Sequence, residues 1–400
     1  MFIDLSTKGL CEMKKYFSII LLIPTLMSCK RTKASLEGAE TLAANESDPD
    51  YSMRLNAAAG VLPVIPFDSG AEYLDIRGVG DSAWSNLKAT KPPVSDFGAA
   101  LRKFDPSGKI LKGDLNFINW ESSVGEYCGS YYDVDYAFLS SPVSISDAFQ
   151  HGFNLFGMAN NHSEDCRTAR DPGGQSVSGA VATQKYMRVF SHQKQMIWHG
   201  VGPGSGFVSS PNVLTFQLKG RSIKVAFGSV AFQGWDCVDS MCEANVQSLL
   251  NGIRDVQADL RILSVHSQGN DAFNRGKKWA ERFIREFSGD LVFAHGPHTW
   301  AGVKLIQKSN GKSGVVFHGL GNFLHNQVAP NPDNLIGRVL LDLKTLQPKQ
   351  VQVIPVLNNA VDVDVVLAPS NKAFPKANLE WTRASLNAHK SVSMGFANLK

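Results

Sequence analysis

Six polar side chains in this sequence follow short apolar runs, and all six are of types that bind divalent metal ions. They are Asp81, Glu121, Asn161, His266, His295 and His298. Carboxylate and amide oxygens together with imidazole nitrogens form a ligand set suited to Zn, Mn or Fe. Two such ions could share the carboxylates, and each could lower the pKa of a bound water enough to form hydroxide near neutral pH. The residue types therefore predict a site for two divalent ions that supports hydrolysis.

Each of these residues also has an ordinary structural explanation. An aspartate after a strand, such as Asp81, often caps a helix or forms a turn, and Asn160 and Asn161 tolerate left-handed turn geometry. A single histidine is more often structural than a ligand. We assign a structural role to the histidines without a strand-end partner, which are His151, His192, His199 and His325. The metal prediction rests on the whole set, in which His295-x-x-His298 is the most specific pair.

Short strands that alternate with helices are the elements expected to position these residues. Apolar runs bounded by turn-forming residues are typical of buried strands. These runs are 72–81, 115–121, 153–162, 223–232, 260–266, 290–298, 314–323, 337–343 and 351–357. Helix-like segments between them cover 143–152, 179–193 and 277–289. The alternation predicts an α/β fold, in which ligands bind at the carboxyl ends of the strands. Asp114 opens its strand, so we place it at the opposite edge.

The order of these clusters resembles that of the CapA family, the poly-γ-glutamate capsule synthesis proteins, which are related in fold to calcineurin-like metallophosphoesterases. The matching stretches run from about Gly78 to Phe323. They are GVGD, DLNFINWE, MANNHSED, GVGPG, SVH, AHGPH and GLGNF, of which ANNH and LGNF are quite specific. The resemblance implies a four-layer α/β/β/α sandwich, metallo-dependent phosphatase-like, with a metal site at one sheet edge.

The resemblance also implies roles for individual residues. The six residues named first would be the metal ligands. His162 would be the acid that protonates a leaving group or steadies an oxyanion, and Asp165 would orient His162. Three asparagines are expected to bind substrate, namely Asn119, Asn160 and Asn322.

This sequence departs from the family pattern in three places. Trp120 replaces the leucine of N-L-E, which alters packing only. The HWG-x-E motif is replaced by His-Ser-Gln-Gly-Asn-Asp at 266–271, and Gly296 stands where GHHPH has its second histidine. The last two changes affect the expected substrate contacts and one metal ligand.

The amino-terminal sequence predicts export and a lipid anchor. A basic Met13-Lys14-Lys15 precedes a short apolar run that ends in Leu-Met-Ser-Cys, which resembles a bacterial lipobox with Cys29 as the lipidated residue. A plain signal peptide is the alternative. The expected organisation is a signal peptide at 1–29, a flexible polar tether at 30–65, a CapA-like domain at 66–360 and a C-terminal extension at 361–400. The protein would then be membrane-anchored on the periplasmic or extracellular face of the envelope.

Export makes disulfide bonds possible. Four cysteines follow Cys29, and an even number is typical of an oxidising compartment. Cys237 and Cys242 flank a short polar loop and could pair locally, which would leave Cys128 to pair with Cys166. In the competing interpretation Cys166 is a soft metal ligand near His162.

The expected function is that of a CapA-like envelope lipoprotein in the synthesis or processing of a capsule or poly-γ-glutamate-type polymer. Its chemistry would be metal-assisted hydrolysis or transfer at a phosphoester or amide bond. The alternatives are a non-catalytic metal-binding component of a polymer synthesis or export complex and a generic phosphoesterase. Expected partners are an anionic polymer or a phosphoester or γ-glutamyl substrate, the membrane, and polymer-synthase membrane proteins. The net charge is only +4, and no Lys/Arg cluster interleaves with aromatics, so nucleic-acid binding is not expected.

Overall fold

The computed structural model describes most of the chain from residue 64 onward. The described ranges are 64–67, 70–93, 96–204, 209–327, 331–359, 364–367 and 392–398. All of them belong to one compact unit, residues 42–400. The predicted signal peptide, its Cys29 and most of the predicted tether lie outside the described residues.

A ten-stranded sheet carries the first half of the site. Its main order is β1-β21-β19-β18-β2-β3-β7-β10, with β17 beside β2 and β20 beside β19. The strands are β1 (Val64–Pro66), β2 (Tyr73–Ala83), β3 (Leu115–Trp120), β7 (Leu155–Gly157), β10 (Ile197–His199), β17 (Asn322–His325), β18 (Asn331–Asp342), β19 (Pro348–Asn359), β20 (Asp364–Leu367) and β21 (Ser393–Asn398). Because β17, β2, β3, β7 and β10 run parallel, their carboxyl ends meet at one edge.

A six-stranded sheet carries the second half of the site. Its order is β11-β12-β13-β14-β16-β15. The strands are β11 (Asn212–Leu218), β12 (Arg221–Phe232), β13 (Leu260–Ser267), β14 (Leu291–His295), β15 (Val303–Gln307) and β16 (Ser313–Phe317). The central strands β12, β13, β14 and β16 are parallel, so this sheet also presents carboxyl ends at a single edge.

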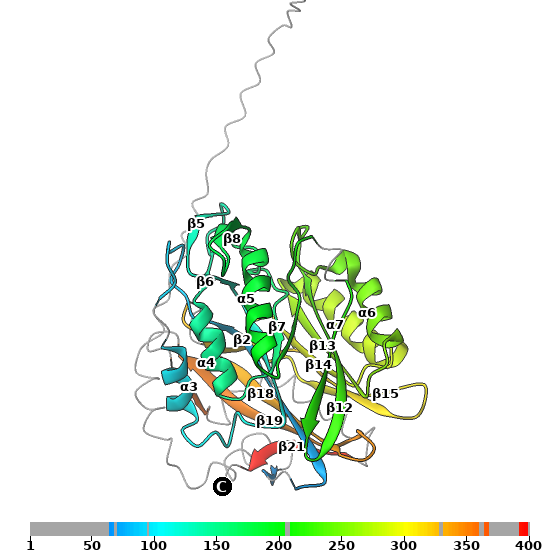
Figure 1. Ribbon diagram of the computed structural model, residues 1–400. Coiled ribbons are helices and arrows are strands. Elements are labelled where there is room, and N and C mark those ends of the chain that lie inside the picture. The colour runs from blue at the N-terminus through cyan, green and yellow to red at the C-terminus, as the bar shows by residue number, and fades with distance from the viewer. Residues whose placement is uncertain are drawn as a thin grey trace, which may run out of the picture. The chain divides into compact units, whose positions relative to one another are not determined.

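The two sheets pack face to face, and helices cover their outer faces (Figure 1). Phe117 of β3 stacks on Phe293 of β14 with ring centres 4.8 Å apart, in the apolar core between the sheets. The helices on the ten-stranded sheet are α3 (Phe97–Phe104), α4 (Pro142–Gln150) and α5 (Gly179–Gln193), and those on the six-stranded sheet are α6 (Val246–Asp255) and α7 (Asn270–Glu286). The predicted four-layer α/β/β/α sandwich is therefore confirmed. No described helix is long and apolar enough to cross a membrane.

Short elements lie beyond the strand ends. They are β4 (Ser123–Val124) with β6 (Leu139–Ser140), the three-stranded sheet of β5 (Cys128–Tyr131), β8 (Cys166–Arg170) and β9 (Ser176–Val177), and the 3₁₀-helix η2 (Glu243–Asn245). Helix α5 has the bounds predicted for it, and the Ser178 side chain caps it by accepting a hydrogen bond from the Val181 N–H.

The ends of the described body extend beyond the expected domain limits. Val64 and Ile65, which were predicted to end the tether, instead belong with Pro66 to β1, and β1 pairs with β21. The segment expected as a C-terminal extension supplies both β20 and β21 to the ten-stranded sheet. Met394 and Ala397 of β21 are buried, so apolar burial explains why this segment joins the sheet.

A buried ion-pair network lies inside the ten-stranded sheet at Asp75 of β2. The Asp75 carboxylate accepts hydrogen bonds of 2.7–3.1 Å from the guanidinium groups of Arg77 and Arg338. Burial opposes ionisation of Asp75, but the two guanidinium groups hold its pKa below the usual 3.8. The ionised carboxylate therefore stabilises the fold above the ordinary pKa, and this contribution is lost as the pH falls through the lowered pKa.

We expect Asp75→Asn to have a lower melting temperature than wild type at neutral pH, because two buried guanidinium groups lose their counter-charge. The difference should begin to shrink below about pH 4, where Asp75 of the unfolded chain binds a proton, and should disappear as the pH falls through the lowered pKa of folded Asp75. Melting curves from about pH 7 to pH 2 check this, with Asp133→Asn, which changes an exposed carboxylate, as the matched control. A gap between wild type and Asp75→Asn that stays constant with pH would contradict the assignment.

Candidate metal centre and cleft

The carboxyl ends of strands from both sheets bring five of the six predicted metal ligands together. Asp81 lies in β2, Glu121 directly follows β3, and His266 and His295 occupy equivalent positions of the parallel strands β13 and β14. His298 follows β14 by three residues. Four of the five are fully buried, and His298 is partly exposed.

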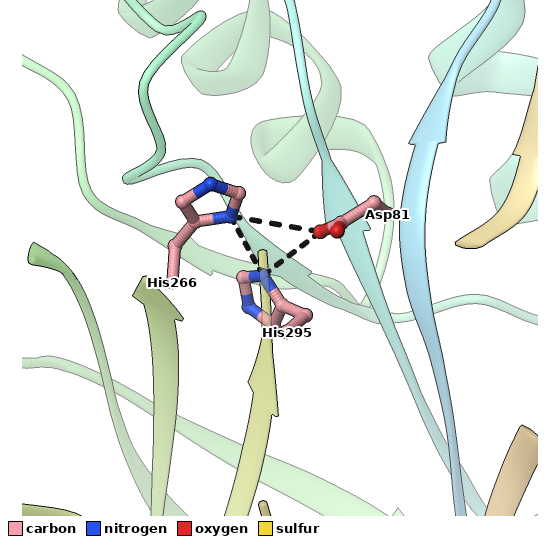
Figure 2. A group of neighbouring side chains, drawn as sticks. All are labelled: Asp81, His266 and His295. Atoms are coloured by element: carbon pink, nitrogen blue, oxygen red, sulfur yellow. Dashed lines mark hydrogen bonds and ion pairs between the residues drawn. The ribbon is translucent and has the colours of Figure 1, made fainter. Parts of the chain in front are cut away.

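The first ligand group consists of Asp81, His266 and His295 (Figure 2). Asp81 Oδ1 lies 3.1 Å from His295 Nδ1 and 3.5 Å from His266 Nδ1. The two imidazole nitrogens are 3.0 Å apart. One carboxylate oxygen and two ring nitrogens from two sheets thus converge on one point.

The second ligand group consists of Asp81, Glu121 and His298, whose ligand atoms lie within 4.8 Å of one another. Here the other Asp81 oxygen, Oδ2, is 3.3 Å from His298 Nδ1. Glu121 Oε1 also lies 3.6 Å from Nε2 of His266, which connects the two groups. Asp81 belongs to both groups, as a carboxylate shared between two ions would.

Neighbouring polar groups fix the orientation of these side chains. Asn119 donates a 2.8 Å hydrogen bond to Asp81 Oδ1, and the Gly296 backbone N–H donates one of 2.9 Å to Oδ2. His298 Nδ1 lies 2.7 Å from Asn322 Oδ1. On His295, Nε2 lies 2.9 Å from Ser264 Oγ, which leaves Nδ1 directed at Asp81. Such contacts hold metal-ligating side chains in place.

The structure explains the glycine in Ala-His-Gly-Pro-His, where the family pattern has histidine. Gly296 has a φ of 105°, in the region that favours glycine. A Cβ at this position would also lie only 2.4 Å from the Ser267 carbonyl oxygen. The backbone turn that presents the Gly296 N–H to Asp81 therefore excludes a side chain here.

The charges of the cluster are strongly coupled. Burial opposes ionisation of Asp81, but hydrogen bonds from His266, His295 and His298 hold its pKa well below the usual range. Burial and the nearby Asp81 charge raise the pKa of Glu121 to about 8. Burial lowers the pKa of His266 to about 4, whereas Glu121 and Asp81 outweigh burial and raise the pKa of His298 to about 10. Perturbed groups of this kind cluster at functional sites.

The residues present fit a divalent metal centre. Buried polar groups almost always have hydrogen-bond partners, because leaving one without a partner costs free energy. At this sheet edge several buried atoms have none. They are both oxygens of Glu121, Nε2 of His266, Oδ1 of Asn161 and Nε2 of His325. Their oxygens and imidazole nitrogens are the donors that Zn, Mn or Fe binds, and a bound ion would satisfy them.

The Asn-Asn-His loop after β7 places Asn161 and His162 beside this cluster. The Asn160 side chain fixes the loop through two hydrogen bonds. It donates one of 2.8 Å to the Trp120 carbonyl oxygen and accepts one of 3.0 Å from the His162 N–H. This leaves Asn161 and His162 to line a cleft of about 710 Å³ that also reaches His298.

His162 and Asp165 form a hydrogen-bonded pair at the side of the cleft. Asp165 Oδ2 lies 2.7 Å from His162 Nδ1 and also accepts a 2.7 Å hydrogen bond from the Phe138 N–H. Burial opposes protonation of His162, but the bond to Asp165 raises its pKa above 6.5. Asp165 thus holds His162 in one orientation, the arrangement expected of an oriented acid.

His325 belongs to the site, although the sequence analysis gave it a structural role. Its Nε2 lies 3.5 Å from Glu121 Oε2, and the side chain lines the cleft. Burial and the charges of His298 and His162 lower the pKa of His325 to about 3, so the ring is neutral. The sequence does contain a signal for this role. His325 ends the apolar run Gly-Leu-Gly-Asn-Phe-Leu-His, just as each candidate metal ligand follows an apolar run.

The predicted substrate-binding asparagines lie next to the ligands. Asn119 is bound to Asp81 and Asn322 to His298, as described above, while Asn160 fixes the loop. All three are buried. Substrate contact by these residues stays a prediction, and the contacts present are with other residues of the site.

Two disulfides flank the cleft. Cys128 of β5 pairs with Cys166 of β8 at a Cα separation of 5.8 Å, and Cys237 pairs with Cys242. These are the two pairings that the sequence analysis favoured, and Cys166 is not a metal ligand here. The first bridge directly follows Asp165 and connects its loop to β5.

We expect the double variant Cys128→Ser/Cys166→Ser to lose about 2–4 kcal/mol of unfolding free energy, because its bridge spans 38 residues. The matched control, Cys237→Ser/Cys242→Ser, removes a bridge over 5 residues and should lose less, since shorter loops constrain the unfolded chain less. Denaturant unfolding measures both losses. A larger loss in the control would contradict this expectation.

The four-layer α/β/β/α sandwich carries two ligand groups that share Asp81 at its sheet edge. The chain belongs to the bacterial capsule synthesis protein family PGA_cap, whose family model matches residues 77–327. This range contains all of the predicted metal ligands together with His162, Asp165 and His325. No curated protein matches the chain.

The chain is similar to three solved structures. A novel phosphatase from Mycoplasma pneumoniae has a TM-score of 0.44 and 12% identity, over 77% of this chain and 99% of its own. A hypothetical protein from Thermus thermophilus has a TM-score of 0.36 and 11% identity, over 69% of this chain and 96% of its own. A 5'-nucleotidase from Candida albicans has a TM-score of 0.33 and 9% identity, over 81% of this chain and 55% of its own.

Proposed function

We propose that this protein is a metal-dependent hydrolase of the cell envelope that cleaves a phosphoester or γ-glutamyl amide bond in the synthesis or processing of a capsule-type polymer. The observation that carries the proposal is the pair of ligand groups that share Asp81, next to the His162–Asp165 pair in an open cleft. Capsule synthesis as the setting comes from the family.

The residues of the site have distinct roles in this reaction. Asp81, Glu121, Asn161, His266, His295 and His298 would hold two divalent ions. Ions bound there would lower the pKa of a water and neutralise negative charge on the substrate. His162 donates its proton to the leaving oxygen or nitrogen as the bond to the phosphorus or carbonyl carbon breaks. Because Nδ1 of His162 faces Asp165, its Nε2 is the atom that exchanges this proton.

Elemental analysis of the purified protein tests the proposal together with hydrolysis assays before and after chelation. Suitable probes are bis(p-nitrophenyl) phosphate and γ-glutamyl p-nitroanilide. We expect bound Zn, Mn or Fe and hydrolysis of one probe that stops on chelation and returns with added metal. Absence of metal together with absence of chelator-sensitive hydrolysis would reject a metal-dependent hydrolase.

A non-catalytic metal-binding component of a polymer synthesis or export complex is the second candidate. It is favoured by the altered segment 266–271, whose Gln268 lines the cleft where the family pattern has different residues. In that case the protein would contain metal and bind polymer or polymer-synthase membrane proteins but show no chelator-sensitive hydrolysis.

A lipid anchor at Cys29 would place this activity at the membrane. Cys29→Ser is expected to release the protein from membranes or to leave it unprocessed, because the thiol that carries the lipid is absent. Membrane fractionation and the intact mass of the recovered protein measure this outcome. Normal membrane retention with an unchanged processed mass would contradict lipidation.

A further inference from the structure

The outer walls of the cleft have a composition unlike that of its floor. The floor carries Asn161, His162, His298 and His325, next to the candidate metal centre. The walls come from two loops, 132–138 between β5 and β6 and 233–238 after β12. A substrate that reacts at the floor must therefore place its remaining part between these two loops.

The wall loops hold most of the exposed large apolar side chains in the described part of the chain. Nine such side chains are exposed, and five of them line this cleft. The five are Tyr132, Val134, Tyr136, Trp235 and Val238. Tyr136 is 61% exposed and Trp235 is 55% exposed, one on each loop. Exposed apolar side chains gathered in this way mark a binding surface.

The charges on the walls are negative. Asp135 and Asp236 are exposed and line the cleft, one on each loop. No lysine or arginine is among the described residues that line it. The guanidinium of Arg167 lies outside the lining, 5.8 Å from the ring centre of Tyr132. A polyanion in the cleft would face these carboxylates without a cation on the walls to offset them.

The walls are held in place by the same loop that carries His162. Glu164 Oε1 accepts hydrogen bonds of 2.7–3.1 Å from Val238 N–H, Asp239 N–H and the Ser240 hydroxyl. These bonds fix the loop 233–238. Asp165 accepts from Phe138 N–H and so fixes the other. The Glu164 carboxylate and Asp165 Oδ2 are thus engaged in protein contacts, whereas Asp135 and Asp236 remain exposed. Preformed walls reduce the entropy lost on binding.

We propose that the cleft binds a substrate in which the part next to the reacting bond carries an ammonium group, so that the substrate is zwitterionic and not a polyanion. Aromatic rings beside carboxylates are the combination that proteins use for primary or quaternary ammonium ions. Asn161 and His325 at the floor lie beside the candidate metal centre, so the reacting bond would lie there and the ammonium group would lie between the walls. This proposal rests on the proposed hydrolase function, with a phosphoester as the reacting bond. It narrows the substrates of that hydrolase to zwitterionic ones.

Calorimetric binding to the full purified protein tests this with three probes. Choline phosphate carries the ammonium group. Its isostere 3,3-dimethylbutyl phosphate replaces the nitrogen with carbon, and γ-linked tetraglutamate represents a polyanion. We expect choline phosphate to bind at least about tenfold more tightly than the isostere, and tetraglutamate to bind more weakly than either.

Variants of the walls assign the preference to named residues. Asp135→Asn/Asp236→Asn and, separately, Trp235→Ala should reduce the choline phosphate preference to about threefold or less. Binding of the isostere should change little in the aspartate variant, whereas Trp235→Ala should weaken it as well, because the tert-butyl group packs on the same ring. Asp133→Asn, which neutralises an exposed carboxylate of the same loop outside the lining, should keep the wild-type preference.

Equal binding of choline phosphate and its isostere, tighter binding of tetraglutamate, no binding of any probe, or an unchanged preference in the wall variants would each overturn the proposal. These readouts need no turnover. Chelator-sensitive hydrolysis without an ammonium preference would leave the hydrolase and reject the zwitterionic substrate. An ammonium preference without chelator-sensitive hydrolysis would support the zwitterionic ligand and reject the hydrolase.

Discussion

His162→Ala is expected to lower turnover by about 10²–10⁴-fold, the range typical of a general acid or base, while the metal content stays close to that of wild type. The reason is its position. His162 lines the cleft and hydrogen bonds to Asp165, but it belongs to neither of the two ligand groups that share Asp81. The measurement is kcat on the phosphoester probe, together with metal per protein in the same sample.

Two further variants separate proton transfer from structural support. His192→Ala removes an exposed histidine in the last turn of α5 and should leave turnover unchanged. Asp165→Asn keeps the shape of the side chain but weakens its hold on His162, so turnover should fall by less than in His162→Ala. Full turnover in His162→Ala would exclude His162 as the acid. A parallel loss of metal would instead make it part of the metal centre.

The positions of the candidate metal ligands could be predicted from the sequence because strand ends are local features. Each ligand follows an apolar run, and parallel strands bring such ends to one edge. The structure shows the consequence in the strand register, where His266 lies opposite His295 and Asp81 lies opposite Asn322. Asp114, placed at the opposite edge from sequence, is ion-paired with Lys219 and lies outside both ligand groups.

His325 also ends an apolar run, but its approach to Glu121 depends on an irregular strand pairing that the run alone does not reveal. Strands β17 and β2 shift register between Asn322 and His325. Such a bulge redirects a side chain relative to its neighbours, and regular alternation does not predict it. Here the shift accompanies the approach of His325 Nε2 to Glu121.

Long-range pairing accounts for the other differences. Strand β21 pairs with β19 and with β1, whose residues lie more than 300 positions earlier in the sequence. The composition of the cleft walls also depends on long-range contacts, since Asp165 holds loop 132–138 and the neighbouring Glu164 holds loop 233–238. The spacing of apolar residues predicts whether a segment forms a helix or a strand, but it does not predict which distant segments become neighbours.

Asp81→Asn is expected to remove bound metal from both ligand groups. Asp81 is the residue that the two groups share, and each of its oxygens faces a different set of histidines. Replacing the carboxylate with an amide removes the negative charge that both ions would use. The loss in metal affinity should exceed about 100-fold, the upper end of what is lost when only a neighbour of a ligand is changed.

The matched control for this prediction is Asp114→Asn. Asp114 also accepts a hydrogen bond from a backbone N–H, that of Asp75 at 2.7 Å, but it lies at the other end of the same strands. Metal bound to the folded protein raises its melting temperature by mass action. Chelation should therefore lower the melting temperature of wild type and of Asp114→Asn, and leave that of Asp81→Asn unchanged. If Asp81→Asn retains wild-type metal content and the same response to chelation, the carboxylate is not shared between two ions, and the centre must be built from other residues.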